Sequence, residues 1–251
     1  MGRFLAIANQ KGGVGKTTTA INIAAALAMA GKKCLIIDLD PQGNATTGLG
    51  IDKKPYQGSH LLLTNASKAI EAIVHSEITG LDLIPSTTTL AEAETELASL
   101  PDRALRLRAA KKELAQRYDL IVVDCPPSVG FFPSNALSCC DLVLVPIQCE
   151  YYAMEGLTQI LSGIAAIKAK LNPQLRVTGI LLTMYEPSTF AKEVVSEVRG
   201  HFAELVYDTK IPRDIALAEA PSHGLPIFQY DPRSRGARAY IEVAKEMMHN
   251  E

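Results

Sequence analysis

The sequence predicts a doubly wound α/β domain, in which a mostly parallel sheet carries helices on both faces. Short aliphatic runs rich in β-branched residues alternate with longer segments of helical periodicity. Several of these runs lack the polar alternation of a half-exposed strand, which is typical of a parallel sheet covered on both faces. A glycine-rich turn joins the first run to a helical segment. Together these observations favour a three-layer α/β fold.

The expected elements follow one another in a regular alternation. Strands are expected at Phe4–Ala8, Cys34–Asp38, Leu81–Pro85, Leu120–Asp124, Leu142–Pro146 and Val177–Thr183, with a weaker one at Leu205–Ile211. Helices are expected at Lys16–Ala30, Thr89–Leu100, Asp102–Arg117, Ala153–Leu171, Phe190–Phe202 and Gly236–His249. The least patterned stretch, Asp52–Ser67, is expected to run over the surface. No domain boundary is visible, so residues 1–251 are interpreted as one domain.

Composition limits the class of protein. Hydrophobic residues make up 47% of the 251 residues, enough for a large core. The formal charge of −2 excludes a global basic field, so any nucleic-acid surface must be a local patch. The five cysteines form no C-x-x-C pair, which favours a reduced cytosolic protein. No signal peptide is expected, and the apolar stretch Ile21–Ala30 is too short to span a bilayer, so no stable membrane insertion is expected.

The turn after the first expected strand has the composition of a phosphate-binding loop. Its glycines let the backbone curl around an anion and direct N–H groups toward it, and the following helix adds its positive end. Lys16 is expected to reach the β- and γ-phosphates, and the Thr17 hydroxyl to bind Mg²⁺. Gln10 replaces the first glycine of the ordinary motif, and Lys11 is an additional lysine. The residues expected to hold the nucleotide are Lys11, Gly12, Gly13, Val14, Gly15, Lys16, Thr17 and Thr18.

Three aspartates end apolar runs, where ligands of doubly wound sheets bind. Asp124 has the sequence form of a Walker B acid that holds magnesium directly or through water. Asp40 is the better candidate for orienting or deprotonating the attacking water, and Asp38 for holding the water shell of the metal. Spacing alone leaves open which of the two has which role. The turns that follow, Pro41–Gly43 and Pro126–Ser128, are candidates for sensing the γ-phosphate.

Three segments together resemble the ParA/MinD family of deviant-Walker ATPases. They are Lys11–Thr18 (KGGVGKTT), Asp38–Asn44 (DLDPQGN) and Asp124–Pro127 (DCPP). Later segments, such as Glu219–Gly224 (EAPSHG) and Tyr230–Gly236 (YDPRSRG), are similar to chromosomal ParA proteins of the Soj type. The resemblance extends over nearly the whole chain and implies a P-loop ATPase that uses ATP and Mg²⁺.

The resemblance also implies roles for individual residues. Lys11 would reach across an ATP-bound dimer to the nucleotide of the partner subunit, adding positive charge as an arginine finger does. Asp40 would be the catalytic switch aspartate, and Asp124 the Walker B residue. The adenine base would lie against Met184, Pro212 and Asp214.

The resemblance further implies partition of a chromosome or plasmid. In this family the ATP-bound homodimer binds double-stranded DNA non-specifically, and a ParB-type partner stimulates an otherwise slow hydrolysis, which implies a cytoplasmic, nucleoid-associated protein. Two arginines that such proteins carry are replaced here by Ser188 and Ala216. Other basic residues remain as candidates for contacting DNA: Lys192, Arg199, Arg213, Arg233, Arg235 and Arg238. These side chains either contact DNA or form ion pairs with Glu193, Glu197, Glu242 and Glu246.

Two alternative functions remain. The missing arginines also fit a ParA-like ATPase that positions a different cargo through a protein scaffold. A MinD-like membrane-associated regulator is less well supported, because the expected helix Gly236–His249 has an apolar face suited to core packing and the chain ends Met-Met-His-Asn-Glu. The five histidines have no metal-ligand spacing, and an iron–sulfur carrier lacks its cysteine pattern.

Overall fold

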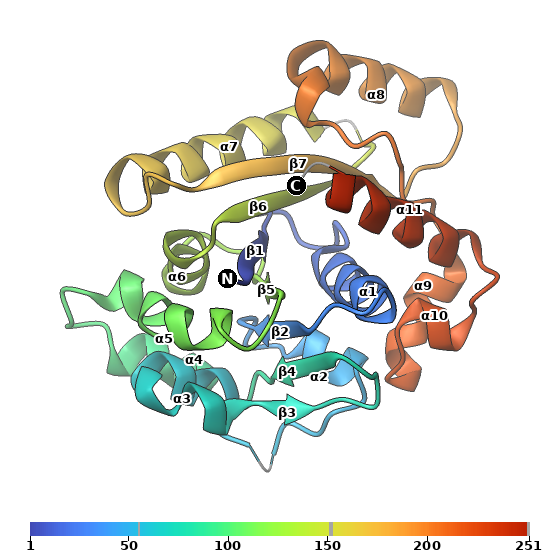
Figure 1. The fold of residues 1–251 in the computed structure, drawn as a ribbon. Coiled ribbons are helices and arrows are strands. Elements are labelled where there is room, and N and C mark those ends of the chain that lie inside the picture. The colour runs from blue at the N-terminus through green and yellow to red at the C-terminus, as the bar shows by residue number, and fades with distance from the viewer. Residues whose placement is uncertain (55, 151–152, 250–251) are drawn as a thin grey trace.

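A seven-stranded sheet forms the centre of the molecule, which a computed structural model describes over residues 1–54, 56–150 and 153–249 (Figure 1). The strand order is β3-β4-β2-β5-β1-β6-β7. All neighbouring strands are parallel except β3 and β4, which pair antiparallel at one edge. The predicted fold class, doubly wound and mostly parallel, is therefore confirmed.

The bounds of the elements are close to those expected. The strands are β1 Arg3–Ile7, β2 Cys34–Asp38, β3 Val74–His75, β4 Leu81–Ile84, β5 Leu120–Asp124, β6 Leu142–Gln148 and β7 Arg176–Thr183. The longer helices are α1 Lys16–Met29, α5 Arg106–Ala115, α6 Phe131–Cys139, α7 Ala153–Lys170, α8 Thr189–Phe202 and α11 Arg235–His249. The shorter ones are α2 Asn44–Gly48, α3 Gly58–Thr64, α4 Leu90–Glu96, α9 Ile215–Glu219 and α10 Ile227–Tyr230, with 3-10 turns η1 Ala66–Ala72, η2 Arg103–Leu105, η3 Ala203–Leu205 and η4 Ala220–His223.

Helices cover both faces of the sheet and produce two separate cores. Along β1, Phe4 and Ala6 belong to the core beneath α3–α8, whereas Leu5 and Ile7 belong to the core beneath α1, α10 and α11. Consecutive strand residues point to opposite faces, so a strand buried on both faces is apolar throughout. This is why the central strands could be predicted from continuous apolar runs.

Two expectations fail at the edges of the sheet. The expected strand at Leu205–Ile211 is wrong. This segment donates two backbone hydrogen bonds to β7, from the amides of Tyr207 and Ile211, and forms an isolated bridge at Val206 rather than a ladder. The two-residue strand β3 was not expected, because an edge strand of that length carries no periodic signal.

The stretch expected to be an unpatterned surface segment contains a short helix with a buried contact. Within Asp52–Ser67, helix α3 places the buried Ser59 hydroxyl 2.6 Å from the backbone carbonyl oxygen of Asp38. Helix α6 was also missed, although most of its residues are buried. Both helices are shorter than three turns, and tertiary burial rather than amphipathic periodicity stabilises them.

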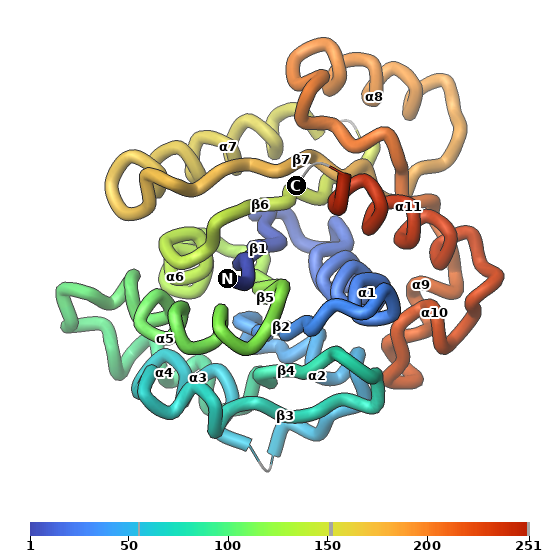
Figure 2. Tube along the Cα trace, in the orientation of Figure 1, coloured from blue at the N-terminus to red at the C-terminus, as the bar shows by residue number. Residues whose placement is uncertain are grey.

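The C-terminal helix α11 packs on α1, which lies more than 200 residues earlier (Figure 2). Tyr240, Val243 and Ala244 are buried there, and the Tyr240 hydroxyl lies 3.1 Å from Oγ1 of Thr19. The apolar face of α11 is therefore used in core packing, as expected. In the part of the chain that the structure describes, no helix combines the length and apolarity needed to cross a membrane.

Loss of the Tyr240 contact is expected to destabilise the fold. Tyr240→Ala leaves a cavity between α11 and α1, so the free energy of unfolding should fall by about 3–5 kcal/mol. Tyr240→Phe removes only the hydrogen bond to Thr19 and should cost about 1 kcal/mol. Urea denaturation without nucleotide measures both changes. Ile241→Ala on the same helix, at a half-exposed position, is the control, and an equal loss there would contradict the assignment.

Candidate functional site

The candidate site lies where β1, β2 and β5 end. These strands are neighbours in the order β2-β5-β1, and Asp124 is in register with both Asp38 and Ile7. The phosphate loop leaves β1 at this same edge. Parallel pairing therefore gathers the loop and two of the three predicted carboxylates, although they are distant in sequence.

The backbone of the phosphate loop requires glycine at two positions. Gly13 and Gly15 have φ angles of 74° and 84°, in the left-handed region that residues with a Cβ rarely adopt. Gly15 immediately precedes α1, so the N-terminal end of this helix faces the loop. Two side chains from neighbouring strands fix the loop. Thr183 Oγ1 donates to the Val14 carbonyl at 2.9 Å, and Gln148 Nε2 donates to the Gly13 carbonyl at 3.2 Å.

Lys16 lies inside the loop and is only 6% exposed. Its Nζ donates to the backbone carbonyl of Lys11 at 2.9 Å. Burial lowers the pKa of the Lys16 ammonium, and the nearby Asp124, Cys125 and Asp40 partly oppose that shift. A cation that burial destabilises is a strong attractor for an anionic ligand, because such a ligand replaces the lost hydration.

Asp124 and Thr17 form a pair suited to a hard cation. Thr17 Oγ1 donates to Asp124 Oδ2 at 2.7 Å, while Asp124 Oδ1 is buried and has no hydrogen-bond partner among the described residues. Burial, together with the nearby Asp38, raises the pKa of Asp124 well above its usual value. An unpartnered buried carboxylate oxygen beside a hydroxyl fits Mg²⁺ or a water bound to it.

Both carboxylate oxygens of Asp38 accept hydrogen bonds from within the protein. Its Oδ1 accepts from the Asp40 amide at 3.1 Å, and its Oδ2 accepts from the Thr46 amide at 2.9 Å and the Thr46 hydroxyl at 2.7 Å. Burial raises the pKa of Asp38 to about 6, and the bonds from Thr46 and Asp40 oppose that rise. The Thr46 hydroxyl also accepts from the Ser86 amide at 2.9 Å. Asp38 thus fixes the turn after β2 and the start of α2.

A carboxyl-edge hollow of about 460 Å³ opens above the phosphate loop. Asp40 lines it, whereas Asp38 does not, and Asp124 lies behind Thr17. Sequence spacing left the roles of Asp38 and Asp40 open. In the structure, Asp40 is the one that faces the hollow. The lining residues are Gly13, Gly15, Lys16, Thr17, Thr18, Asp40, Asn44, Thr47, Gly48, Pro127, Met184, Pro221 and Ser222.

An apolar extension of about 260 Å³ continues this hollow beyond Gly15 and Thr18. Met184, Pro212 and Asp214, expected near a base, line it together with Ile211 and Leu217. The Asp214 carboxylate is already engaged, because it accepts from the Ala216 and Gly236 amides at 3.2 and 2.8 Å. Met184 has a φ angle of 50°, which is disfavoured for a residue with a Cβ and marks a constrained position.

Lys11 points away from the carboxyl-edge hollow. It is absent from the described lining, and its Nζ lies 2.7 Å from Oε2 of Glu150, two residues after the end of β6. Both side chains are about half exposed, at 43% and 49%. Asn9 supports this geometry, since its Oδ1 accepts from the Lys11 amide at 3.0 Å and its Nδ2 donates to the Pro146 carbonyl. Neither Asn9 nor Glu150 was predicted, because such contacts depend on the neighbouring strand.

The six basic candidates do not form the ion pairs expected from sequence. Arg199 pairs with Asp208 at 2.9 Å and Arg213 with Glu186 at 3.1 Å. Two of the four expected partners are used elsewhere, since Glu246 accepts from backbone amides at Asp208 and Thr209 and Glu242 pairs with Lys245. Arg235 donates to a backbone carbonyl, at Arg213. Among the described residues, acidic partners are lacking for the exposed Lys192, Arg233 and Arg238.

Ser188 and Ala216, which replace the two expected arginines, have structural roles at the starts of two helices. Ser188 caps α8 by accepting from the Ala191 amide at 3.1 Å, and Ala216 lies in the first turn of α9. Neither provides a phosphate ligand of positive charge.

Thr46 is expected to be essential for holding the turn that carries Asp40. Thr46→Val keeps the shape of the side chain but removes the donor to Asp38 and the acceptor for Ser86, so the free energy of unfolding should fall by about 1–3 kcal/mol. Thr47→Val is the matched control on the same helix, because Thr47 is exposed and should change stability by less than about 0.5 kcal/mol. Urea denaturation at pH 7 compares them, and equal losses would contradict the role of Thr46.

Known proteins resemble this chain over its full length. A family model described as an AAA domain matches residues 2–177. The sporulation initiation inhibitor protein Soj of Bacillus subtilis is 48% identical over 252 residues, covering 100% of both chains. The chromosome partitioning protein ParA of Myxococcus xanthus is 46% identical, covering 99% of this chain and 88% of that one.

A solved structure is similar to this chain in fold and sequence. The structure of cobyrinic acid a,c-diamide synthase from Mycobacterium smegmatis, with bound ADP and magnesium, is 36% identical with a TM-score of 0.86 and covers 99% of this chain and 95% of that one. Matches of this identity and coverage extend well beyond the phosphate loop. The chain belongs to the ParA/Soj family of P-loop ATPases.

Proposed function

We propose that the carboxyl-edge hollow binds ATP with Mg²⁺ and that the chain hydrolyses ATP to ADP and phosphate. The observation that carries this proposal is the buried Lys16 beside the Thr17–Asp124 pair, in which one carboxylate oxygen has no partner among the residues that the structure describes. The loop amides and Lys16 would hold the phosphates, and Thr17 and Asp124 would hold the metal. When bound, Mg²⁺ would neutralise charge on the phosphate oxygens.

Asp40 and Asp38 take different roles in this proposal. Asp40 lines the hollow and would orient or deprotonate the attacking water. Asp38 would act as a positioning residue, since both of its oxygens accept hydrogen bonds from the turn and from α2. The adenine base would occupy the apolar extension beside Met184 and Pro212. Asp214 would shape its wall by capping α9 with its carboxylate, whose two oxygens already accept from the Ala216 and Gly236 amides.

The position of Lys11 supports a dimerising switch. Its ammonium lies outside its own hollow, held by Glu150 on an exposed edge. When two ATP-bound chains meet face to face, Lys11 of each would exchange Glu150 for the phosphates of the partner subunit's nucleotide. A charge added in this way stabilises the transition state only in the dimer. Hydrolysis would therefore depend on assembly.

Such a switch would partition a chromosome or plasmid. The relatives named above as Soj and ParA support this use. The ATP-bound homodimer would bind double-stranded DNA without sequence preference, and a ParB-type partner would stimulate hydrolysis. The exposed cations Lys192, Arg233 and Arg238 would contact phosphates. The chain would act as a single domain, 1–251, in the cytoplasm at the nucleoid.

One observation favours a second candidate function. Ser188 and Ala216 provide a helix cap and a helix turn where arginines would contact DNA, so the switch would instead position a different cargo on a protein scaffold. Binding of DNA by the ATP-loaded chain distinguishes the two functions directly. For a MinD-like membrane role there is less support, because α11 buries much of its apolar face against α1.

Magnesium affinity is expected to increase with pH. Burial raises the pKa of Asp124, so protons compete with the metal for its carboxylate at low pH, and that competition is lost as pH rises. Titration of Mg²⁺ into ADP-loaded protein at pH 6, 7 and 8 should show that the native chain binds Mg²⁺ more tightly as the pH rises. Asp124→Asn should bind more weakly and lose this pH dependence, whereas the exposed Asp52→Asn should behave as native. A native affinity independent of pH would contradict the coupling.

The switch is tested by measuring ATP hydrolysis and retention on duplex DNA together across a salt series. Asp40→Ala should bind ATP but hydrolyse it about 10²–10⁴-fold more slowly, and so stay on DNA longer. Lys11→Ala should bind ATP but neither dimerise nor bind DNA. Failure of both the native chain and Asp40→Ala to bind DNA with ATP, even at low salt, would favour the second candidate.

The basic candidates are tested in the same salt series. Arg233→Gln/Arg238→Gln should reduce the slope of log affinity against log salt by roughly 0.9 per lost contact. Lys54→Gln/Lys68→Gln removes equal charge from exposed positions far from α11 in the sequence and should leave the slope unchanged.

A further inference from the structure

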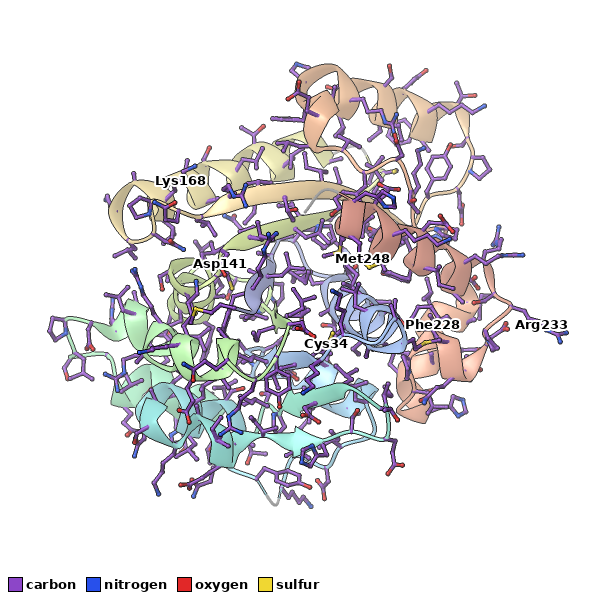
Figure 3. All side chains as sticks on the ribbon, in the orientation of Figure 1. Cys34, Asp141, Lys168, Phe228, Arg233 and Met248 are labelled. Carbon is purple, nitrogen blue, oxygen red and sulfur yellow. The ribbon has the colours of Figure 1, made fainter. Side chains whose placement is uncertain are left out.

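A second hollow, of about 780 Å³, lies at the opposite edge of the sheet, where β1, β6 and β7 begin. This amino-edge hollow shares no lining residue with the carboxyl-edge hollow. Figure 3 places Asp141, directly before β6, left of the centre of the view, and Arg233, in the turn before α11, at its right-hand edge. The lining residues are Met1, Gly2, Arg3, Arg108, Lys111, Lys112, Ala115, Asp141, Gln174 and Arg176.

The charge of this hollow contrasts with that of the whole chain. Its lining contains five cationic side chains and one carboxylate, whereas the chain carries a formal charge of −2. The single carboxylate, Asp141, is already neutralised, because it pairs with Lys111 at 2.6 Å and accepts from the Phe4 amide at 2.9 Å. No carboxylate within the described part of the chain pairs with Arg108, Lys112 or Arg176. An excess of positive charge therefore remains.

Contacts around the hollow hold the Lys111 and Arg108 side chains and the backbone at Arg176. Lys111 also donates to the Cys139 carbonyl at 2.7 Å and lies 5.6 Å from the centroid of the Phe4 ring. The Arg108 guanidinium donates to the Leu171 carbonyl at 3.2 Å. The Arg176 amide donates to the Asp141 carbonyl at 3.1 Å, which anchors the start of β7. Like charges gathered around one hollow repel each other, and a bound anion would relieve that repulsion.

A solvated basic face is the ordinary explanation for surface cations. Here, however, the cations come from β1, α5 and the start of β7 and surround one concavity. Two of the three without carboxylate partners are arginines, whose planar guanidinium groups match phosphate oxygens better than any other side chain does.

We propose that the amino-edge hollow is a binding site for phosphate groups, separate from the nucleotide site. Arg108, Lys112 and Arg176 supply the charge, and Lys111 completes the rim while balancing Asp141. The same chemistry has two possible sources, a free oligophosphate or the backbone of duplex DNA. With DNA as the source, this edge of the molecule would add contacts to those of the α11 region.

The test for a free ligand uses inorganic tripolyphosphate, titrated by calorimetry into protein that holds Mg-ADP, with magnesium in excess. Lys112→Gln/Arg176→Gln changes two exposed side chains and should weaken binding about 5- to 30-fold, as expected for two lost partly exposed charge contacts. Lys54→Gln/Lys68→Gln removes the same charge elsewhere and should bind as native. Any binding at the phosphate loop is common to all three proteins, so their difference isolates the amino edge. Equal thermal unfolding of the three proteins confirms that each is folded.

The test for DNA measures retention of the ATP-loaded proteins on duplex DNA across the salt series. A reduced salt slope for Lys112→Gln/Arg176→Gln alone assigns the site to DNA. Weaker tripolyphosphate binding with unchanged DNA retention assigns it to a free ligand. If this variant matches its control in both measurements, the proposal is wrong. Only the DNA test rests on the proposed function, because a chain that bound no DNA would still show the difference with tripolyphosphate.

Discussion

Three charged side chains, Lys16, Asp38 and Asp124, lie buried close to one another at the carboxyl ends of β1, β2 and β5, and the site is organised around them. Burying a charge is costly unless partners replace its hydration. Asp38 obtains three hydrogen bonds from the turn and from α2, which satisfies it within the protein. Lys16 and Asp124 remain incompletely satisfied, so the protein is preorganised for a ligand that carries both anionic oxygens and a cation.

The same constraint links the site to the rest of the molecule. Through Thr46, Asp38 connects the end of β2 to α2 and to Ser86 beyond β4. Helix α2 in turn contacts η4, where Gly50 and Gly224 approach so closely that a Cβ on Gly224 would lie 2.6 Å from the Cα of Gly50. The turn that carries Asp40 is thus linked through α2 to η4, whose Pro221 and Ser222 also line the carboxyl-edge hollow.

Charge is distributed unevenly over the two edges of the sheet. At the carboxyl edge, cations and carboxylates are interleaved, and Lys11 is restrained by Glu150. At the amino edge, cations predominate around a single neutralised carboxylate. Because the chain is slightly acidic overall, this local excess does not follow from composition and arises only where separate elements meet.

The sequence by itself determined the fold class, six of the seven strands and the phosphate loop, because continuous apolar runs and closely spaced glycines encode them locally. It also placed Asp40 and Asp124 at strand ends, but it left the division between Asp38 and Asp40 open. Only the tertiary structure decided that Asp38 faces Thr46 while Asp40 faces the hollow. The Lys11–Glu150 pair, the partners of Arg199 and Arg213, and the amino-edge hollow likewise join residues far apart in the chain or on separate elements. Such contacts depend on strand order and helix packing, and no local pattern encodes them.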